Sequence, residues 1–313
     1  MEFVIIAKKN MKNKHKIIFS FFLLFIILFL SACSLNEKKE YENEKIKVMT
    51  TILPQVEFVE RIGGDKVEVS EMIPPGFSPA TFELNPKKIE ELKSLDIYFR
   101  IGHVEFEKSQ MKKIESLNPN MRVVDTSEGI SLINQIDHHH DEENDNEHEE
   151  GDDPHIWLSP RLVKIQAEHI LQALIDFSPE NENYFKENYN EFISDLDNLD
   201  QRLSEVFLPI KNKLILVYHP AFGYLADAYG FKQEAIEIEG KDPSPKQIKD
   251  IVDKARELKI TTVFVQAQFD TKSANAIAKE INGAVVSIDP LAKEYFSNLE
   301  NMANSIVNTY QYE

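Results

Sequence analysis

Apolar, β-branched runs alternate with helical patterns along two stretches of this chain, and this alternation constrains the fold more than any other feature. It is typical of sheets whose strands run parallel and are covered by helices. We therefore predict an α/β protein with two lobes, each built on a largely parallel sheet. The predicted strands are 46–52, 67–73, 97–101 and 121–124, then 214–218, 231–239, 261–266 and 284–288, and the predicted helices include 86–95, 245–258, 272–281 and 294–310.

Two further helical patterns separate these stretches. Residues 161–177 form an amphipathic pattern that stops at Ser178 and Pro179, and apolar side chains then recur at helical spacing through residues 180–206. The second helix would be about 40 Å long. It is either an ordinary packed helix or a rigid spine that limits how far two lobes open, and we favour the spine. The predicted domains are a first lobe at 46–177, a linking helix at 178–208 and a second lobe at 209–313.

The N-terminal segment has the pattern of a secretory signal. A lysine-rich run within residues 8–16 precedes an apolar run at 17–30 and the tetrapeptide Leu30-Ser31-Ala32-Cys33. The apolar run, about 14 residues, is shorter than the roughly 18 to 20 that span a bilayer, which argues against the alternative of a membrane anchor helix. The tetrapeptide resembles a bacterial lipoprotein signal. This resemblance implies that a signal peptide, 1–32, is removed and that Cys33 is lipidated, so the protein would be extracytoplasmic and held at the cell membrane by lipid alone.

The residues after Cys33 have the composition of a solvated tether, which we place at 33–45. The true start is Met1 or Met11. The formal net charge of −18 argues against nucleic acid and anionic bilayers as partners and favours cations. Because Cys33 is the only cysteine, the chain has no disulfide framework and no thiolate metal cluster. Zinc would then use histidine and carboxylate ligands.

Histidine and aspartate residues follow predicted strands at positions where ligands gather. His219 directly follows the strand 214–218 and Asp289 follows the strand 284–288, each with a proline behind it, and His103 lies just past the strand 97–101. Ligands of open α/β sheets bind at the carboxyl ends of the strands. His155 precedes a helix, between Pro154 and Trp157, and would be either a ligand or a packed loop residue. His169, in mid-helix, is expected to be a surface or packing residue.

Several motifs in order along the chain resemble one known family. They are Pro74-Pro75-Gly76 with Phe82-Glu83, Asp153-Pro154-His155-Ile156-Trp157-Leu158-Ser159-Pro160, His219 with Ala221-Phe222-Gly223-Tyr224, Glu239-Gly240-Lys241-Asp242-Pro243-Ser244-Pro245, Gln266-Ala267-Gln268-Phe269 and Asp289-Pro290-Leu291. They resemble the substrate-binding proteins of zinc and manganese ABC importers. The resemblance implies two Rossmann-like lobes joined by one long rigid helix, with a divalent metal ion between them. The ligands would be His155 from the first lobe and His219 and Asp289 from the second, and the partner an ABC permease.

The resemblance favours zinc over manganese, because zinc members of the family tend to have histidine where His219 stands. This sequence departs from the family's pattern at one position. The family's first histidine follows a Pro-Gly-x-x-Pro stretch, and here Ala80 occupies that place. We hypothesise that His103 replaces it; the alternatives are a water ligand or a carboxylate such as Glu83 or Glu107.

Residues 138–153 form an acidic, almost entirely polar stretch with four histidines: His138, His139, His140 and His148. Such a segment cannot pack and is expected to be a mobile loop. It is either a solvated acidic loop or a secondary, weaker zinc-binding segment. Zinc members of the family often carry a comparable insertion, and we predict that deleting residues 138–150 leaves a tight site intact.

Four other functions were weighed for a chain of this kind. A manganese receptor of the same family differs only in the metal. A surface adhesin with a structural metal would not exchange it reversibly, and a zinc hydrolase would need an acid–base carboxylate and has no His-Glu-x-x-His motif here. A haem, cobalamin or siderophore receptor would need a wider cleft. The prediction is therefore a monomeric receptor without enzymatic activity, whose affinity falls as pH drops towards about 6.5, the usual histidine pKa.

Overall fold

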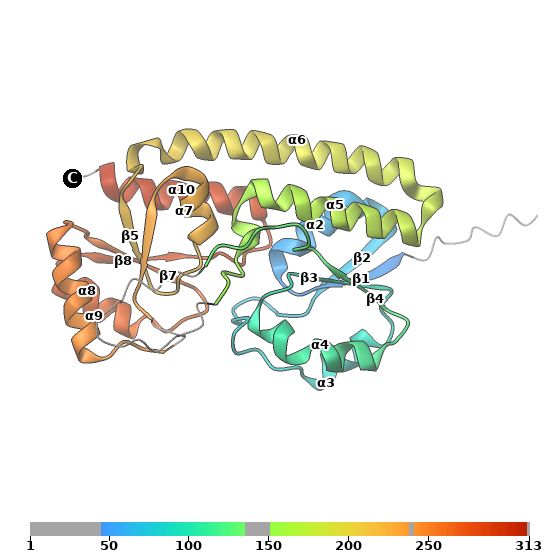
Figure 1. Cartoon of the computed structure of the whole chain (residues 1–313), viewed down its shortest axis with the longest axis horizontal. Coiled ribbons are helices and arrows are strands. Elements are labelled where there is room, and N and C mark those ends of the chain that lie inside the picture. The colour runs from blue at the N-terminus through green and yellow to red at the C-terminus, as the bar shows by residue number, and fades with distance from the viewer. Residues whose placement is uncertain (1–44, 135–150, 238–240, 312–313) are drawn as a thin grey trace, which may run out of the picture. The chain divides into compact units, whose positions relative to one another are not determined.

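The protein folds into two α/β lobes, each with a parallel sheet, as the alternation of strands and helices predicts. The computed structural model describes residues 45–134, 151–237 and 241–311. The first sheet has the strand order β2-β1-β3-β4 and the second β6-β5-β7-β8, and every pairing is parallel (Figure 1). The strands are β1 (Ile46–Thr50), β2 (Val67–Glu71), β3 (Ile97–Arg100), β4 (Arg122–Asp125), β5 (Leu214–Val217), β6 (Lys232–Ala235), β7 (Thr262–Gln266) and β8 (Ala284–Ile288).

Several helices start at residues that favour a helix N-terminus. Pro86 stands in the first turn of α3 (Pro86–Leu92), where the Asn85 side chain accepts a hydrogen bond from the Lys88 amide. A capping box formed by Ser244 and Gln247 begins α8 (Pro245–Glu257). The remaining helices are α2 (Leu53–Gly63), α4 (Glu105–Leu117), α5 (Pro160–Phe177), α6 (Glu182–Phe207), α7 (Gly223–Tyr229), α9 (Lys272–Glu280) and α10 (Tyr295–Gln311), with short 3-10 turns at Gly64–Lys66, Ile156–Leu158, Pro179–Asn181 and Leu208–Ile210.

Helix α6 packs against both lobes. It contacts α2 and α5 of the first lobe and α7 and α10 of the second (Figure 1). With 26 residues it is about 39 Å long. Its apolar side chains, which recur every three, four or seven positions, are buried: Phe185, Phe192, Leu196, Leu199, Leu203 and Phe207.

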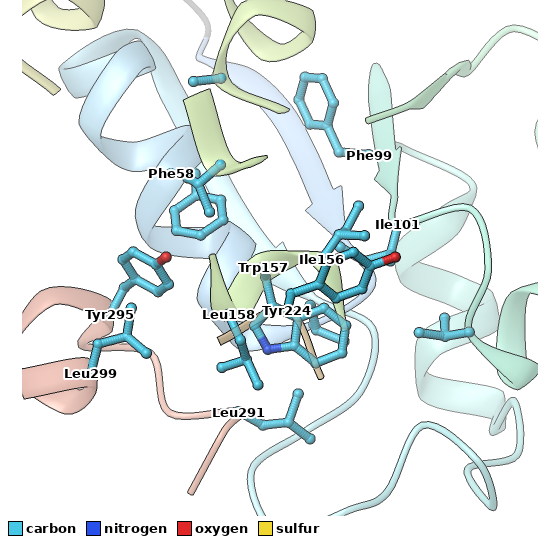
Figure 2. Packing of buried hydrophobic residues seen from close by; sticks show 14 of the residues in the cluster. Phe58, Phe99, Ile101, Ile156, Trp157, Leu158, Tyr224, Leu291, Tyr295 and Leu299 are labelled. Atoms are coloured by element: carbon cyan, nitrogen blue, oxygen red, sulfur yellow. The ribbon is translucent and has the colours of Figure 1, made fainter. Parts of the chain in front are cut away.

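One hydrophobic cluster runs through the first lobe, along α5 and α6 and into α7 and α10. A second cluster lies between the second sheet and the helices α8 and α9. Figure 2 shows part of the first cluster, where Trp157 and Leu158 lie near Leu291, and Phe58 lies beside Tyr295. Because the shared cluster joins the lobes, opening them would expose apolar surface at a cost of about 25 cal/mol per Å². The structure thus favours small relative movements of the lobes.

Candidate metal centre

His155 and His219 meet between the two lobes. His155 lies directly before the 3-10 turn Ile156–Leu158, and His219 follows β5 after one residue. Their Nε2 atoms are 3.2 Å apart and their ring centroids 5.1 Å apart, although the residues are 64 positions apart in sequence. His155 is buried and His219 is half-buried. Two ring nitrogens from opposite lobes therefore point at the same place.

The other ring nitrogen of each histidine contacts a buried carboxylate. His155 Nδ1 lies 2.6 Å from Asp153 Oδ1, and His219 Nδ1 lies 2.5 Å from Glu237 Oε1. An ionised carboxylate only accepts hydrogen bonds, so it favours the tautomer with the proton on Nδ1. Both Nε2 atoms then carry lone pairs, and two lone pairs facing each other at this distance repel unless a cation lies between them.

The spacing of the two Nε2 atoms fits a metal ion. Zinc–nitrogen bonds of about 2.0–2.1 Å at a tetrahedral angle place two nitrogens about 3.3 Å apart. Carboxylates behind ligating histidines are the usual arrangement at such sites, because they fix the ring and raise its basicity. Burial lowers the pKa of His219 below its ordinary value, outweighing the opposite effect of its hydrogen bond to Glu237. A neutral imidazole is the form that binds metal.

Gln266 fixes the backbone of His219 from the end of β7. Its side-chain oxygen accepts a hydrogen bond from the His219 amide at 3.2 Å, and its side-chain nitrogen donates to the His219 carbonyl at 2.6 Å. This buried amide thus pairs with both backbone polar groups of His219. The ring of Phe269 stacks on the imidazole, with centroids 5.0 Å apart. Gln266 thus holds the backbone of His219, and Phe269 packs against the face of its ring.

Asp289 lines a cavity that neighbours that of the histidine pair, and it is held by other contacts. Its Oδ1 accepts hydrogen bonds from Gln268 Nε2 at 2.8 Å and from the Leu291 amide at 2.9 Å. A cavity of about 10 Å³ borders Asp289, and one of about 30 Å³ borders both histidines. Gln268 and Leu291 line both cavities. In the parts of the chain that the structure describes, no three His, Cys, Asp or Glu side chains converge closely enough to hold a metal, so Asp289 would have to shift.

The residues directly before Ala80 reach the larger cavity from the first lobe. Ser78 and Pro79 line this cavity, whereas Ala80 is exposed and does not line it. His103 is half-buried just before α4 and is not among the described residues that line either cavity. The structure thus brings together His155 and His219, places Asp289 at a neighbouring cavity, and places His103 at neither cavity.

Glu107, one of the carboxylates considered as a ligand, has a structural role. It is buried and accepts hydrogen bonds from the Ile101 amide at 2.8 Å, the Gly102 amide at 2.6 Å and the Thr51 hydroxyl. Burial raises its pKa to about 7. Glu107 therefore holds the turn between β3 and α4.

The other candidates lie outside this site. Glu83 is exposed, and His169 is a half-buried helix residue whose Nε2 lies 2.9 Å from the Glu128 carbonyl, away from both cavities. Cys33 and the loop histidines His138, His139, His140 and His148 lie outside the described residues. No helix in the described parts of the chain is long and apolar enough to cross a bilayer.

Sequence reasoning did not assign roles to Asp153, Glu237, Gln266 or Gln268. Asp153 stands two residues before His155, a spacing at which a side chain can reach back to the ring, and this signal was present in the sequence. Gln266 and Gln268 belong to the motif Gln266-Ala267-Gln268-Phe269, but nothing local to this motif indicates that they contact His219 and Asp289. Glu237 carries no local signal, because β6 reaches the site only through its pairing with β5.

Each lobe has a parallel sheet and contributes one histidine to a buried site between the lobes. This arrangement defines a two-lobed solute-binding protein. Residues 48–309 match the family "Zinc-uptake complex component A periplasmic" (ZnuA), and the chain belongs to this family. Members of the family are solute-binding receptors that work with the permease of an ABC importer, not enzymes. The predicted fold, family and absence of enzymatic activity are confirmed.

Relatives of both metal specificities are similar over most of the chain. The "High-affinity zinc uptake system protein ZnuA" of Bacillus subtilis strain 168 is 28% identical over 297 residues, covering 87% of this chain and 89% of the relative. The "Manganese ABC transporter substrate-binding lipoprotein PsaA" of Streptococcus anginosus is 27% identical over 304 residues, covering 90% and 97%. A crystal structure of ZnuA is 36% identical with a TM-score of 0.78, covering 84% of this chain and 98% of that one.

Proposed function

We propose that this chain is an extracytoplasmic zinc receptor that binds the ion between its lobes and delivers it to the permease of an ABC importer. The observation that carries the proposal is the pair of Nε2 atoms of His155 and His219, 3.2 Å apart and each backed by a buried carboxylate. Asp289 would complete the protein ligands after releasing its contact with Gln268. The remaining position would be filled by His103 or by water.

Ligand chemistry supports zinc over manganese. Two imidazoles with one carboxylate suit zinc, whereas manganese prefers sites richer in oxygen. The zinc relative and the manganese relative are almost equally similar to this chain, so the ligand set is the argument for zinc. Manganese is the second candidate, and the presence of the carboxylate of Asp289 favours it.

Metal content measured by mass spectrometry tests this proposal. The purified chain is stripped of metal, reloaded from an equimolar mixture of zinc and manganese, and compared with the double variant His155→Ala, His219→Ala. The variant His169→Ala is the control, because His169 lines neither cavity. We expect about one zinc per chain in the wild type and in the control and none tightly held in the double variant. Retained manganese would overturn the choice of metal, and no retained metal in the wild type would overturn the receptor function.

We further propose that Cys33 carries a lipid that holds the receptor at the cell membrane. The lipoprotein-like tetrapeptide supports this proposal, as does the word "lipoprotein" in the name of the manganese relative. Cys33→Ala should move the protein from the membrane fraction to the soluble extracytoplasmic fraction. A variant that stays in the membrane fraction would contradict the lipid anchor.

A further inference from the structure

The segment that carries Asp289 belongs to the second lobe in sequence but docks on the first. The Trp157 indole Nε1 donates a hydrogen bond to the Pro290 carbonyl at 2.8 Å. Glu57 of α2 accepts a hydrogen bond from the amide of Tyr295 at 2.5 Å. Elements of the first lobe therefore hold both ends of the segment 290–295.

Two further contacts support this docking. The ring of Phe58 on α2 packs edge-on against Tyr295, with centroids 4.9 Å apart. Lys293 Nζ lies 2.8 Å from Glu60 Oε1, an exposed pair that adds little to stability. The buried contacts therefore carry most of the attachment.

Trp157 links the two candidate ligands most directly. It lies two residues after His155, its ring centroid is 5.1 Å from that of His155, and it is only 1% exposed. Its hydrogen-bond acceptor, the Pro290 carbonyl, belongs to the residue next to Asp289. Figure 2 shows Trp157 with Leu158 on the first lobe and Leu291 nearby. One buried hydrogen bond thus connects the turn that carries His155 to the backbone beside Asp289.

Asp289 is in turn fixed to that backbone. Its Oδ1 accepts a hydrogen bond from the Leu291 amide, and its carbonyl accepts one from Asn298 Nδ2 at 2.7 Å. A shift of Pro290 would therefore move the carboxylate with it. His219, by contrast, is held by Gln266 and Glu237, which belong to the second lobe.

We propose that Trp157 is a positioning residue that fixes Asp289 relative to His155 through its hydrogen bond to the Pro290 carbonyl. His155 and Asp289 then form one half of the metal site and His219 the other, although Asp289 and His219 come from the same sheet. This inference rests on the proposed function, because it takes Asp289 as a metal ligand.

The variant Trp157→Phe tests the inference, because it keeps an aromatic ring and removes the N–H donor. Zinc affinity is measured in the full chain by competition with a chromophoric chelator, and the zinc dissociation rate by stopped flow. Losing the donor to a buried carbonyl should weaken zinc binding about tenfold, mainly through faster dissociation. Tyr310→Phe removes a hydroxyl donor to the Leu214 carbonyl and serves as the matched control, with unchanged affinity expected.

A double-mutant cycle separates positioning from general destabilisation. If Trp157 acts through Asp289, Trp157→Phe has no further effect on zinc affinity in the Asp289→Ala background. An equal loss in both backgrounds, or unchanged affinity in Trp157→Phe alone, would overturn the inference while leaving the receptor function in place. A wild-type chain that holds no zinc would overturn both.

A second measurement needs no metal. Amide hydrogen exchange across residues 289–299 should be faster in metal-free Trp157→Phe than in the wild type, and unchanged in Tyr310→Phe. Equal exchange in Trp157→Phe and the wild type would show that this hydrogen bond does not hold the segment, which would also overturn the inference.

Discussion

His155 and His219 present their Nε2 atoms to each other at 3.2 Å while each Nδ1 atom contacts its own buried carboxylate. This arrangement leaves the two unprotonated nitrogens facing one another, which is unfavourable without a cation. The contacts behind the two rings therefore hold the proposed ligands at the spacing that zinc requires. A metal ion would relieve the repulsion and join the lobes at the same time.

Glu237 should matter for zinc affinity although it is not a proposed ligand. Glu237→Gln removes the negative charge behind His219 and lets the amide present a donor to Nδ1, which favours the wrong tautomer. We expect zinc affinity to fall about 10- to 100-fold. Glu234→Gln is the matched control, because Glu234 is a buried glutamate on β6, three residues before Glu237, and pairs with Lys254 at 2.7 Å. Equal losses in the two variants, measured by chelator competition, would refute this role.

Zinc affinity should depend on pH in a range set by His219. Burial, the largest effect, lowers the pKa of His219 below 6.5, so protons compete with zinc at this residue only in more acidic solution. We expect nearly constant affinity above about pH 6.5, the ordinary histidine pKa, and a fall only in more acidic solution. Competition titrations on both sides of this pH check this. An affinity that already falls between about pH 8 and 7 would contradict it.

The same shift affects the stability of the metal-free protein. Between the folded pKa of His219 and 6.5, the unfolded chain binds more protons than the folded one. The contribution of His219 to the stability of the folded protein is therefore complete above pH 6.5. It is lost as the pH falls through the pKa that His219 has in the folded state. His219→Asn should remove this part of the pH dependence of the free energy of unfolding. A pH profile in urea that is identical for variant and wild type would argue against the shift.

Glu107 should have the opposite effect on stability. Burial raises its pKa from 4.5 to about 7, so the folded protein binds more protons than the unfolded chain between these values. Its contribution is fully present below pH 4.5 and is lost as pH rises through about 7. The glutamine of Glu107→Gln does not titrate, so the variant lacks this loss of stability. Between pH 4.5 and 8, its free energy of unfolding should rise by about 2–3 kcal/mol relative to that of the wild type. If the free energies of unfolding of the wild type and of Glu107→Gln, measured by urea unfolding, change equally with pH, this prediction is wrong.

His103→Ala tests the remaining ligand. The hypothesis that His103 supplies the fourth ligand requires it to move to the histidine pair, and predicts that the variant loses at least tenfold in zinc affinity. His169→Ala, at another histidine outside the cavity, is the control. Unchanged affinity in His103→Ala would assign the position to water.

Deleting residues 138–150 should leave the tight site intact. Asn134 and Asp152 on either side form an antiparallel bridge, so a short turn can close the gap. We expect the deletion variant to keep one tightly bound zinc and to lose weaker, multiple binding, as measured by isothermal titration. Loss of the tight zinc would show that the loop belongs to that site.

The sequence predicted the local structure well where the signals were local. The long run of apolar side chains at helical spacing predicted 180–206 as a helix, and α6 spans Glu182–Phe207. The strand predicted at 231–239 is shorter, since β6 ends at Ala235. Helices α2, α4 and α7 were not among the helices predicted from the sequence.

The sequence by itself determined the two α/β lobes, the linking helix and the strand ends at which His219 and Asp289 lie, because periodicity and strand-end position are properties of neighbouring residues. Only the tertiary structure decided that His155 meets His219, that Glu237 backs the imidazole, and that Trp157 connects Asp289 to the first lobe. These contacts join residues 18 to 133 positions apart. They depend on how strands pair and lobes pack, and non-local packing leaves no pattern along the chain.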